Sequence, residues 1–202
     1  MVDYSIENEY REKGFNIICG VDEAGRGPLA GPVYAAAVIL PSDCVIEGLN
    51  DSKKLTEKKR EALFDEIKEK ALAYGIASAD EKEIDEINIL NATFLAMKRA
   101  IASLSVRSDL ALIDGNQKPH TDIEEVTVIK GDAKSMSIAA ASVLAKVSRD
   151  RFMLEMAEKY PQYEFARHKG YGTKLHYEKI AQYGVCDIHR RTFLKKILGE
   201  QK

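Results

Sequence analysis

The amino-acid sequence predicts an α/β fold, in which a β-sheet is flanked by helices. Short apolar runs rich in β-branched residues alternate along the chain with longer segments of helical periodicity, and Gly or Pro residues separate the two kinds of segment. The chain has 202 residues, a length that fits one main domain with a small appendage.

The first part of the chain predicts three strands and one helix. Asn16–Val21 and Val33–Leu40 are apolar runs, so we expect two strands joined through a tight glycine-rich loop. Thr56 is a suitable cap for a helix over residues 57–72, and Tyr74–Ala79 follows as a third strand.

The middle of the chain predicts two more strands between two helices. A helix from Asn88 to about Leu104 is indicated by apolar residues at spacings of three and four. Leu110–Ile113 and Val126–Ile129 follow as strands, each with a glycine and an aspartate close behind it. Ser135–Met156 is rich in alanine and free of Gly and Pro, which favours a long helix packed closely on the sheet.

The character of the chain changes beyond Tyr160–Pro161. The remainder is basic and aromatic, with HKGYGT as a loop and two helices near Lys174–Tyr183 and Arg190–Leu198. From Lys146 onward 13 Lys and Arg residues stand against 7 Asp and Glu residues, whereas the first 145 residues hold 17 against 25. This asymmetry favours a basic phosphate-binding surface beside an acidic, cation-binding body, although uneven charge can also arise by chance.

Thiol usage and apolar runs bear on the environment of the protein. Cys19, Cys44 and Cys186 are far apart and never form a CxxC pair, so we expect reduced thiols rather than disulfides or a zinc site. No run of about 18 apolar residues is present to span a bilayer, and the N-terminal residues are too charged for a signal peptide. We therefore expect a cytosolic protein that does not bind membranes.

Four acidic residues interrupt or follow apolar strands: Asp22, Glu23, Asp114 and Asp132. One aspartate after a strand is more often a turn or helix cap than a ligand. Four carboxylates at strand ends are costly to bury unless a cation neutralises them, and oxygen ligands without His or Cys select Mg²⁺ or Mn²⁺. Two such ions could clamp the attacking and leaving oxygens of a phosphodiester displacement.

Regular strand geometry poses one difficulty for this set of acids. Consecutive side chains point to opposite faces, so Asp22 and Glu23 could not share an ion within a regular strand. We therefore expect the strand to end at Asp22 and the following AGRG turn to re-aim Glu23. The four histidines, at 120, 168, 176 and 189, have no ligand spacing, and we do not expect a histidine metal site.

The motifs around these acids resemble those of the ribonuclease HII family. The matching blocks keep the order found in the family and cover nearly all of the chain beyond the first 15 residues. They are GVDEAGRGPLAGPV (Gly20–Val33), DSKKL (Asp51–Leu55), IDG (Ile113–Gly115), KGDAKSMSIAAASVLAKVSRDR (Lys130–Arg151), KGYGT (Lys169–Thr173) and IHRRTF (Ile188–Phe193).

The resemblance implies a ribonuclease H-like mixed β-sheet flanked by helices, with a small C-terminal helical segment. Residues 1–15 would be an N-terminal extension, residues 16–158 the catalytic core and residues 159–202 a substrate-binding segment, with 16–202 forming one type 2 ribonuclease H domain. The implied enzyme is a monomeric endoribonuclease that uses Mn²⁺ or Mg²⁺. Its substrates would be the RNA strand of RNA–DNA hybrids and single ribonucleotides in duplex DNA, cut on their 5′ side to leave 3′-hydroxyl and 5′-phosphate ends.

The resemblance also assigns roles to individual residues. It makes Asp22, Glu23, Asp114 and Asp132 the catalytic, metal-binding set. It implies that the backbone of Gly25, Arg26 and Gly27 reads the ribose 2′-hydroxyl and that Tyr171 packs on the neighbouring deoxyribose, roles that suit glycine and a flat ring. The expected phosphate contacts are cations that would each alone be interpreted as solvated: Lys53, Lys169, Arg190 and Arg191.

Three other functions fit parts of the sequence. A dinucleotide-binding loop would explain Gly25 and Gly27 after a strand, but the third glycine stands at 31, and Pro28 and Pro32 obstruct the helix that a pyrophosphate needs. A ribonuclease HIII shares the carboxylates but usually carries an additional N-terminal domain, whereas about 15 residues precede the first strand. A hybrid-binding protein without catalysis would not need all four acids.

Overall fold

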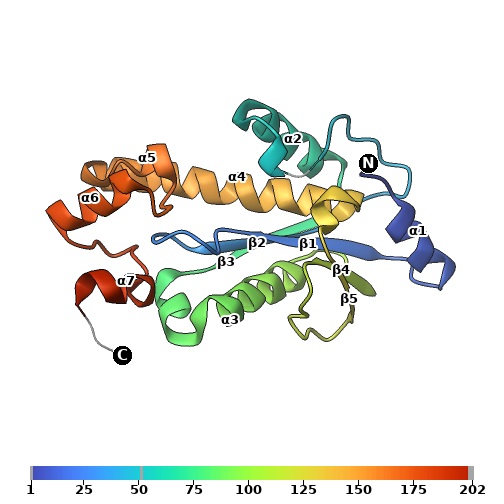
Figure 1. Cartoon of the computed structure of the whole chain (residues 1–202). Coiled ribbons are helices and arrows are strands. Elements are labelled where there is room, and N and C mark those ends of the chain that lie inside the picture. Colours follow the sequence, from blue (N-terminus) through green and yellow to red (C-terminus); the bar gives the residue numbers. More distant parts are fainter. Residues whose placement is uncertain (1, 51, 200–202) are drawn as a thin grey trace.

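The structure, a computed structural model, describes residues 2–50 and 52–199 and contains a five-stranded mixed β-sheet with helices on both faces (Figure 1). The strand order is β3-β2-β1-β4-β5. Strand β1 is antiparallel to β2 and parallel to β4, and β4 is parallel to β5. The expected α/β class is confirmed. The strands are β1 Ile18–Ala24, β2 Val33–Ile39, β3 Ala73–Ala79, β4 Leu110–Asp114 and β5 Glu124–Val128.

Helices α2 (Glu57–Lys70) and α4 (Met136–Lys159) cover one face of the sheet, and α3 (Glu81–Ala102) covers the other (Figure 1). Alternate residues of the central strands contribute to two apolar cores, one beneath α2 and α4 and the other beneath α3. The helix predicted after Thr56 is confirmed, and Thr56 Oγ1 accepts a hydrogen bond from the backbone N–H of Lys59 at 3.3 Å.

Helix α3 begins at Glu81, whereas the sequence predicted a start at Asn88. A capping box forms the earlier start, because the side chains and backbones of Asp80 and Glu83 exchange hydrogen bonds at 2.8 and 3.0 Å. Asn88 is nevertheless a break, with a φ of 67° and a ψ of 164° inside the helix. Its side chain accepts hydrogen bonds from the next turn and so caps the part of α3 that the apolar periodicity predicted.

Strand β1 is longer than predicted, and this corrects one expectation about the acids. The strand continues beyond Val21 through Ala24, because residues 22–24 pair with residues 34–36 of β2. Asp22 and Glu23 therefore both lie within a regular strand and point to opposite faces of the sheet. The glycine-rich turn begins after Ala24 and does not re-aim Glu23.

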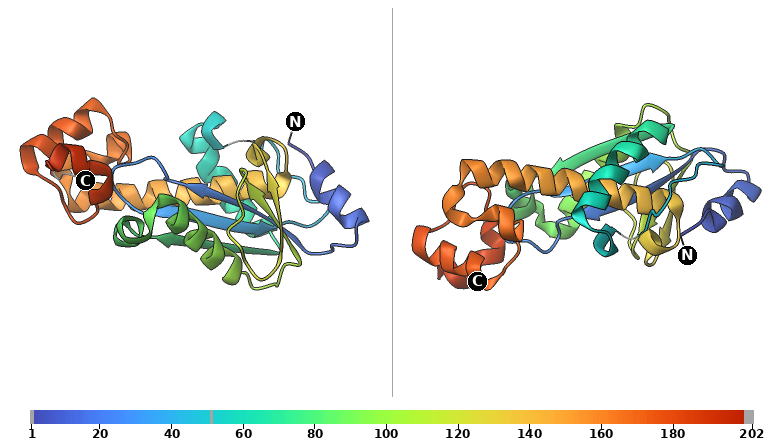
Figure 2. Two further views of the ribbon diagram at one scale, coloured as in Figure 1. Left: turned by 60° about the horizontal axis from the view of Figure 1, so that its bottom comes forward. Right: turned by 90° about the horizontal axis from the view of Figure 1, so that it is seen from above.

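The C-terminal helices gather at one end of the molecule (Figure 2). They are α5 (Phe165–His168), α6 (Lys174–Tyr183) and α7 (Arg191–Leu198). The prediction for α6 is confirmed, and α7 begins one residue later than predicted because Arg190 is its N-cap residue. Helix α4 runs along the sheet to this end, so it connects the C-terminal helices to the strands (Figures 1 and 2).

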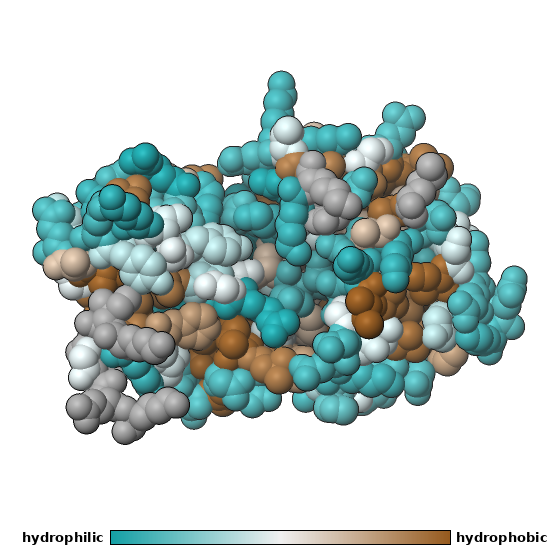
Figure 3. Space-filling model, viewed as in Figure 1, coloured by the Kyte–Doolittle hydropathy of each residue, from teal (hydrophilic) through white to brown (hydrophobic). Residues whose placement is uncertain are grey.

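The thiols, the helices and the surface bear on the environment expected for the protein. All three cysteines are free, with Cys19 and Cys44 buried. Among the described residues, no helix is both long and apolar enough to cross a membrane. Figure 3 shows a face on which hydrophilic residues predominate and apolar residues form separate patches.

The sequence predicted no element before β1, but residues Ser5–Glu12 form helix α1 at the end of the molecule opposite the C-terminal helices (Figure 2). Glu7 is buried, and its Oε1 accepts hydrogen bonds from Ser135 Oγ at 2.7 Å and from Ser137 N–H and Oγ at 3.0 and 2.6 Å. Ser135 is the N-cap of α4, so this carboxylate lies at the positive end of the helix dipole. The N-terminal residues thereby hold the start of α4.

We predict that Glu7→Ala lowers the free energy of unfolding by about 2–3 kcal/mol, because it leaves the buried serine hydroxyls and a helix N-terminus without their acceptor. The control is Glu9→Ala on the same helix. Glu9 is exposed and pairs with Lys13 four residues on, so its loss should cost under about 0.5 kcal/mol. Urea unfolding at neutral pH measures both changes, and equal costs for the two variants would contradict this account of α1.

Candidate active site

The carboxylates of Asp22, Asp114 and Asp132 meet at one end of the sheet. Asp22 lies near the end of β1, and Asp114 is the last residue of its parallel neighbour β4. Asp132 lies in the short 3-10 turn Gly131–Ala133 just before α4. One carboxylate oxygen from each residue lies within 4.8 Å of the other two, so the three side chains can coordinate one cation.

Hydrogen bonds from backbone N–H groups and burial both act on the carboxylates of this cluster. The N–H of Gly131 donates to Asp114 Oδ1 at 2.6 Å, and the N–H of Glu23 donates to Asp22 Oδ1 at 2.7 Å. Asp22 is only 4% exposed; its burial, followed by the charges of Glu23 and Asp114, raises its pKa well above the usual value. A divalent cation bound among these oxygens would offset both the burial and the mutual repulsion.

Glu23 is not one of the three clustered carboxylates. It lines a small hollow together with Asp114 and side chains of α3, and it also lines a second hollow on the side of α4. Burial raises the pKa of Glu23, while Arg26, whose Nη1 lies 3.6 Å from Glu23 Oε1, acts in the opposite direction. The role of Glu23 as a metal ligand stays a prediction.

The second hollow brings together residues that the sequence singled out from distant segments. It has a volume of about 180 Å³, and its walls include Glu23, Gly25, Arg26, Lys53 and Tyr171. Asp51, the first residue of the DSKKL block, lies outside the described residues. Two residues that the sequence analysis did not select, Ser142 and Lys146 of α4, also line this hollow.

Gly25 and Gly27 of the GRG segment meet different structural requirements. Gly25 has a φ of 101°, and a Cβ atom there would lie 2.1 Å from Nε of Arg149. Gly27 has ample room, since the nearest atom to its Cβ position would be Cε1 of Tyr171 at 4.0 Å. Gly25 is therefore required by the packing of the protein itself, whereas Gly27 keeps the space before the Tyr171 ring open.

Arg190 corrects an expectation, because it is neither a solvated cation nor available to a phosphate. Its side chain is 0% exposed, and its guanidinium donates to the backbone carbonyls of Gly25, Arg26 and Gly31. The neighbouring Arg191 is exposed, and its backbone N–H donates to Asp85 Oδ2 at 2.8 Å. Of these two arginines, Arg191 thus has a side chain that can reach a substrate, and Arg190 does not.

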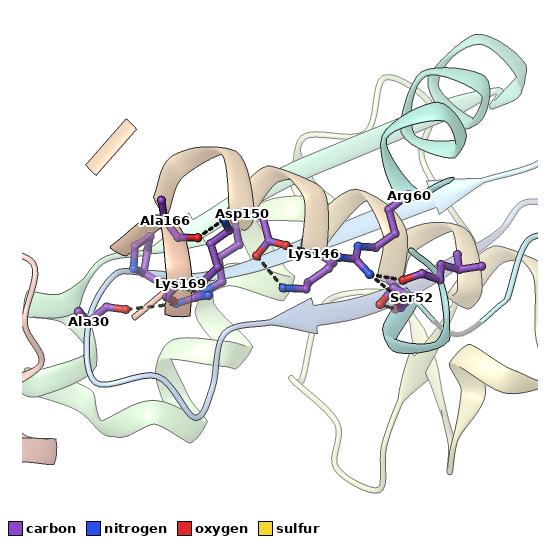
Figure 4. Close-up of polar contacts among 11 residues, drawn as sticks. Ala30, Ser52, Arg60, Lys146, Asp150, Ala166 and Lys169 are labelled. Atoms are coloured by element: carbon purple, nitrogen blue, oxygen red, sulfur yellow. Dashed lines mark hydrogen bonds and ion pairs between the residues drawn. The ribbon is translucent and has the colours of Figure 1, made fainter. Parts of the chain in front are cut away.

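Polar contacts lie along α4 and beside two of the predicted substrate-binding residues, Lys53 and Lys169 (Figure 4). Lys146 Nζ donates to Asp150 Oδ1 at 2.6 Å, and Arg60 donates to the carbonyl of Ser52 at 3.0 Å, next to Lys53. Lys169 Nζ donates to the carbonyl of Ala166 at 2.7 Å. The pairing of Lys146 with Asp150 was not recognised in the sequence, where both residues lie within an alanine-rich helix.

Three histidines that are separate in the sequence, His168, His176 and His189, pack together beneath Tyr171. His176 Nδ1 lies 3.0 Å from the carbonyl of Tyr171, and its Nε2 lies 3.1 Å from Nε2 of His189. The N–H of Cys186 donates to His189 Nδ1 at 2.9 Å, so the histidine chain is consistent with neutral rings. Burial agrees with this, since it lowers the pKa of His176 and of His189 to about 4.

Comparisons with known proteins agree with this geometry. The sequence profile of the family described as ribonuclease HII matches residues 19–196. The ribonuclease HII of Caldicellulosiruptor bescii is 57% identical over 196 residues, which cover 97% of this chain and 95% of that protein. The ribonuclease HII of Endomicrobium trichonymphae is 59% identical over 191 residues, covering 94% of this chain and 91% of that protein.

A solved structure extends the likeness to three dimensions. The crystal structure of ribonuclease H2 from Pyrococcus horikoshii OT3 superposes with a TM-score of 0.75 at 28% identity, covering 92% of this chain and 97% of that one. Enzymes of the matching family cut RNA within RNA–DNA hybrids and depend on divalent metal ions. The dinucleotide-binding alternative is therefore set aside. From its motifs, fold and relatives, this chain belongs to the ribonuclease HII family and is an endoribonuclease of the ribonuclease H type.

Proposed function

We propose that this enzyme cuts RNA–DNA hybrids and also cuts on the 5′ side of single ribonucleotides embedded in duplex DNA, leaving 3′-hydroxyl and 5′-phosphate ends. The observation that carries the proposal is the three-carboxylate cluster next to a hollow walled by the GRG segment and Tyr171. A cation site beside exposed backbone and a flat ring suits a sugar whose 2′-hydroxyl must be recognised before its phosphate is cut.

Mn²⁺ or Mg²⁺ is the proposed cofactor, because the clustered donors are all carboxylate oxygens. We assign Asp22, Glu23, Asp114 and Asp132 as the residues that hold two ions, with Glu23 contributing from the opposite face of β1. When bound, the ions supply Lewis acidity that stabilises the charge developing on the phosphodiester.

The chain's own residues bind and orient the nucleic acid. The open face of Gly27 and the ring of Tyr171 offer surfaces for two adjacent sugars, and Arg26 and Lys53 add positive charge in the same hollow. We assign Lys169 and Arg191 as phosphate contacts outside that hollow, within a substrate-binding segment over residues 159–202 that follows the core at 16–158. These assignments fit the positive net charge of the C-terminal part of the chain.

We predict that Asp114→Asn lowers turnover by about a thousandfold or more while the fold persists, because the variant keeps the shape of the side chain but loses a charged ligand. The assay uses an end-labelled duplex with one ribonucleotide and a matched RNA–DNA hybrid, each with Mg²⁺ or Mn²⁺, and maps the cut. Asp122→Asn is the control, since that side chain is 87% exposed, and it should retain wild-type turnover. Full activity of the wild type in excess chelator, or cutting of the hybrid alone, would refute the corresponding part of the proposal.

We predict that Asp22→Asn raises the melting temperature of the metal-free protein at about pH 8 and abolishes its stabilisation by added Mg²⁺. The folded-state pKa of Asp22 is raised, so its contribution to stability is present below the unfolded pKa of about 3.9 and is lost as the pH rises through the folded value. The difference between variant and wild type should therefore nearly vanish at about pH 4. Asp65→Asn, at an exposed position on α2, should show no such pH dependence, and a difference that is equal at both pH values would refute the prediction.

We predict that Tyr171→Ala reduces cleavage at a single ribonucleotide at least tenfold without changing metal affinity, because the neighbouring deoxyribose loses a packing surface worth about 1–3 kcal/mol. Tyr171→Phe should keep much of the activity, since the ring rather than the hydroxyl makes the contact. Tyr74→Ala is the control: Tyr74 is 37% exposed, against 44% for Tyr171, and lies at the start of β3. A wild-type rate for Tyr171→Ala would pass this role to another residue.

A further inference from the structure

Two buried arginines lie behind the loop that carries the GRG segment. Arg149 comes from the middle of α4 and Arg190 from the residue before α7, and both are 0% exposed. The loop, which joins β1 to β2 over residues 25–32, is the segment proposed to read the ribose. Neither arginine lines the hollow that holds the predicted substrate-binding residues.

Arg190 holds this loop by hydrogen bonds to backbone carbonyls of the loop. Its Nη2 donates to the carbonyl of Gly25 at 2.6 Å, its Nη1 to that of Arg26 at 3.0 Å and its Nε to that of Gly31 at 2.8 Å. Its own backbone N–H donates to the carbonyl of Leu29 at 2.9 Å. One residue thus fixes carbonyls at both ends of the loop, including two within the GRG segment itself.

Arg149 joins the same loop to the segment that carries Tyr171. Its Nε donates to the carbonyl of Pro32 at 3.2 Å, and its Nη2 donates at 3.1 Å to the carbonyls of both Ala30 and Lys169. The centre of its guanidinium lies 5.6 Å from the centroid of the Tyr171 ring, within the range of a cation–π contact. Arg149 therefore touches both of the elements that must be spaced correctly to read two adjacent sugars.

Within the described residues, carbonyl oxygens rather than carboxylates accept the hydrogen bonds of these two guanidinium groups. Asp150, the neighbour of Arg149, pairs with Lys146 at 2.6 Å, and Asp85 accepts from the backbone of α7. In the same part of the chain, Nη1 of Arg149 is buried without a hydrogen-bond partner among the residues that the structure describes. Burial, and then the charge of Arg149, lowers the pKa of Arg190 to about 9. Burying the charged guanidinium therefore costs free energy that an apolar side chain would not cost.

We infer that Arg149 and Arg190 are positioning residues that fix the GRG loop relative to Tyr171 and thereby set the selectivity of the enzyme for a ribonucleotide. The inference rests on the proposed function and adds the residues that give its two sugar-reading elements a fixed separation. A planar guanidinium has donors in a rigid fork, so it can hold several carbonyls in a defined arrangement, whereas a lysine ammonium on a flexible stem cannot. The residues act through the loop and do not contact the substrate themselves.

The test compares Arg149→Lys and Arg190→Lys, which replace the rigid fork of donors by one amino group on a flexible stem, with Arg151→Lys as the control. Arg151 is on the same helix, but it points outward and its Nε pairs with Glu61 at 3.1 Å. All variants carry Asp114→Asn so that the duplexes are not cut. The measured quantity is the ratio of affinities for a duplex with one ribonucleotide and for the all-DNA duplex of the same sequence, together with the slope of log affinity against log salt.

We expect Arg149→Lys and Arg190→Lys each to lower the affinity ratio at least tenfold, with an unchanged salt slope and an unchanged affinity for all-DNA duplex. Arg151→Lys should change none of these. The inference is overturned if a folded variant keeps the wild-type ratio, or if Arg190→Met lowers the salt slope by about 0.9, the value for one lost phosphate contact. The two lysine variants remove different contacts, so either one decides if the other does not fold. A wild-type protein with no preference for the ribonucleotide would instead refute the proposed function.

Discussion

The concentration of carboxylates at the ends of β1 and β4 is the constraint on which the rest of this structure depends. Two adjacent parallel strands deliver Asp22 and Asp114 to the same edge, and the turn before α4 adds Asp132. Such a cluster opposes folding when it is charged, because burial and mutual repulsion both act against it. The sheet must therefore be stable enough from its two apolar cores to hold the cluster until a cation binds.

Helix α4 is the element that connects this cluster to the GRG loop and the Tyr171 segment. Its N-terminus follows Asp132 and is held by Glu7 of α1, while its middle carries Arg149 beneath the GRG loop and the Tyr171 segment. A rigid helix with the carboxylate cluster near one end and Arg149 further along keeps a fixed distance between the two. The helix therefore sets the distance between the proposed sugar-reading segment and the proposed metal site.

The sequence predicted most of the features that depend on local patterns, although the capping box at Asp80 was overlooked, and it missed those that depend on distant partners. Strand β2 and helices α2 and α6 follow from periodicity and caps, and the motifs identified the carboxylates before their geometry was known. The extension of β1 through Glu23 depends on pairing with β2, which no local pattern encodes. Arg190 was misassigned for the same reason: an arginine is exposed by default, and its carbonyl partners lie about 160 residues earlier in the chain.

The active region thus contains two kinds of buried charge that are separated in space. The carboxylates near the strand ends form the proposed metal site, and the arginines behind the GRG loop hold the proposed sugar-reading segment through its carbonyls. If the two sets lay in contact they would pair, and the carboxylates would be less able to bind a cation. The arginines instead donate to loop carbonyls, and Asp150 pairs with Lys146 rather than with Arg149. Backbone carbonyl dipoles can stabilise a guanidinium without a carboxylate partner, so the loop is held in place without drawing a carboxylate away from the cluster.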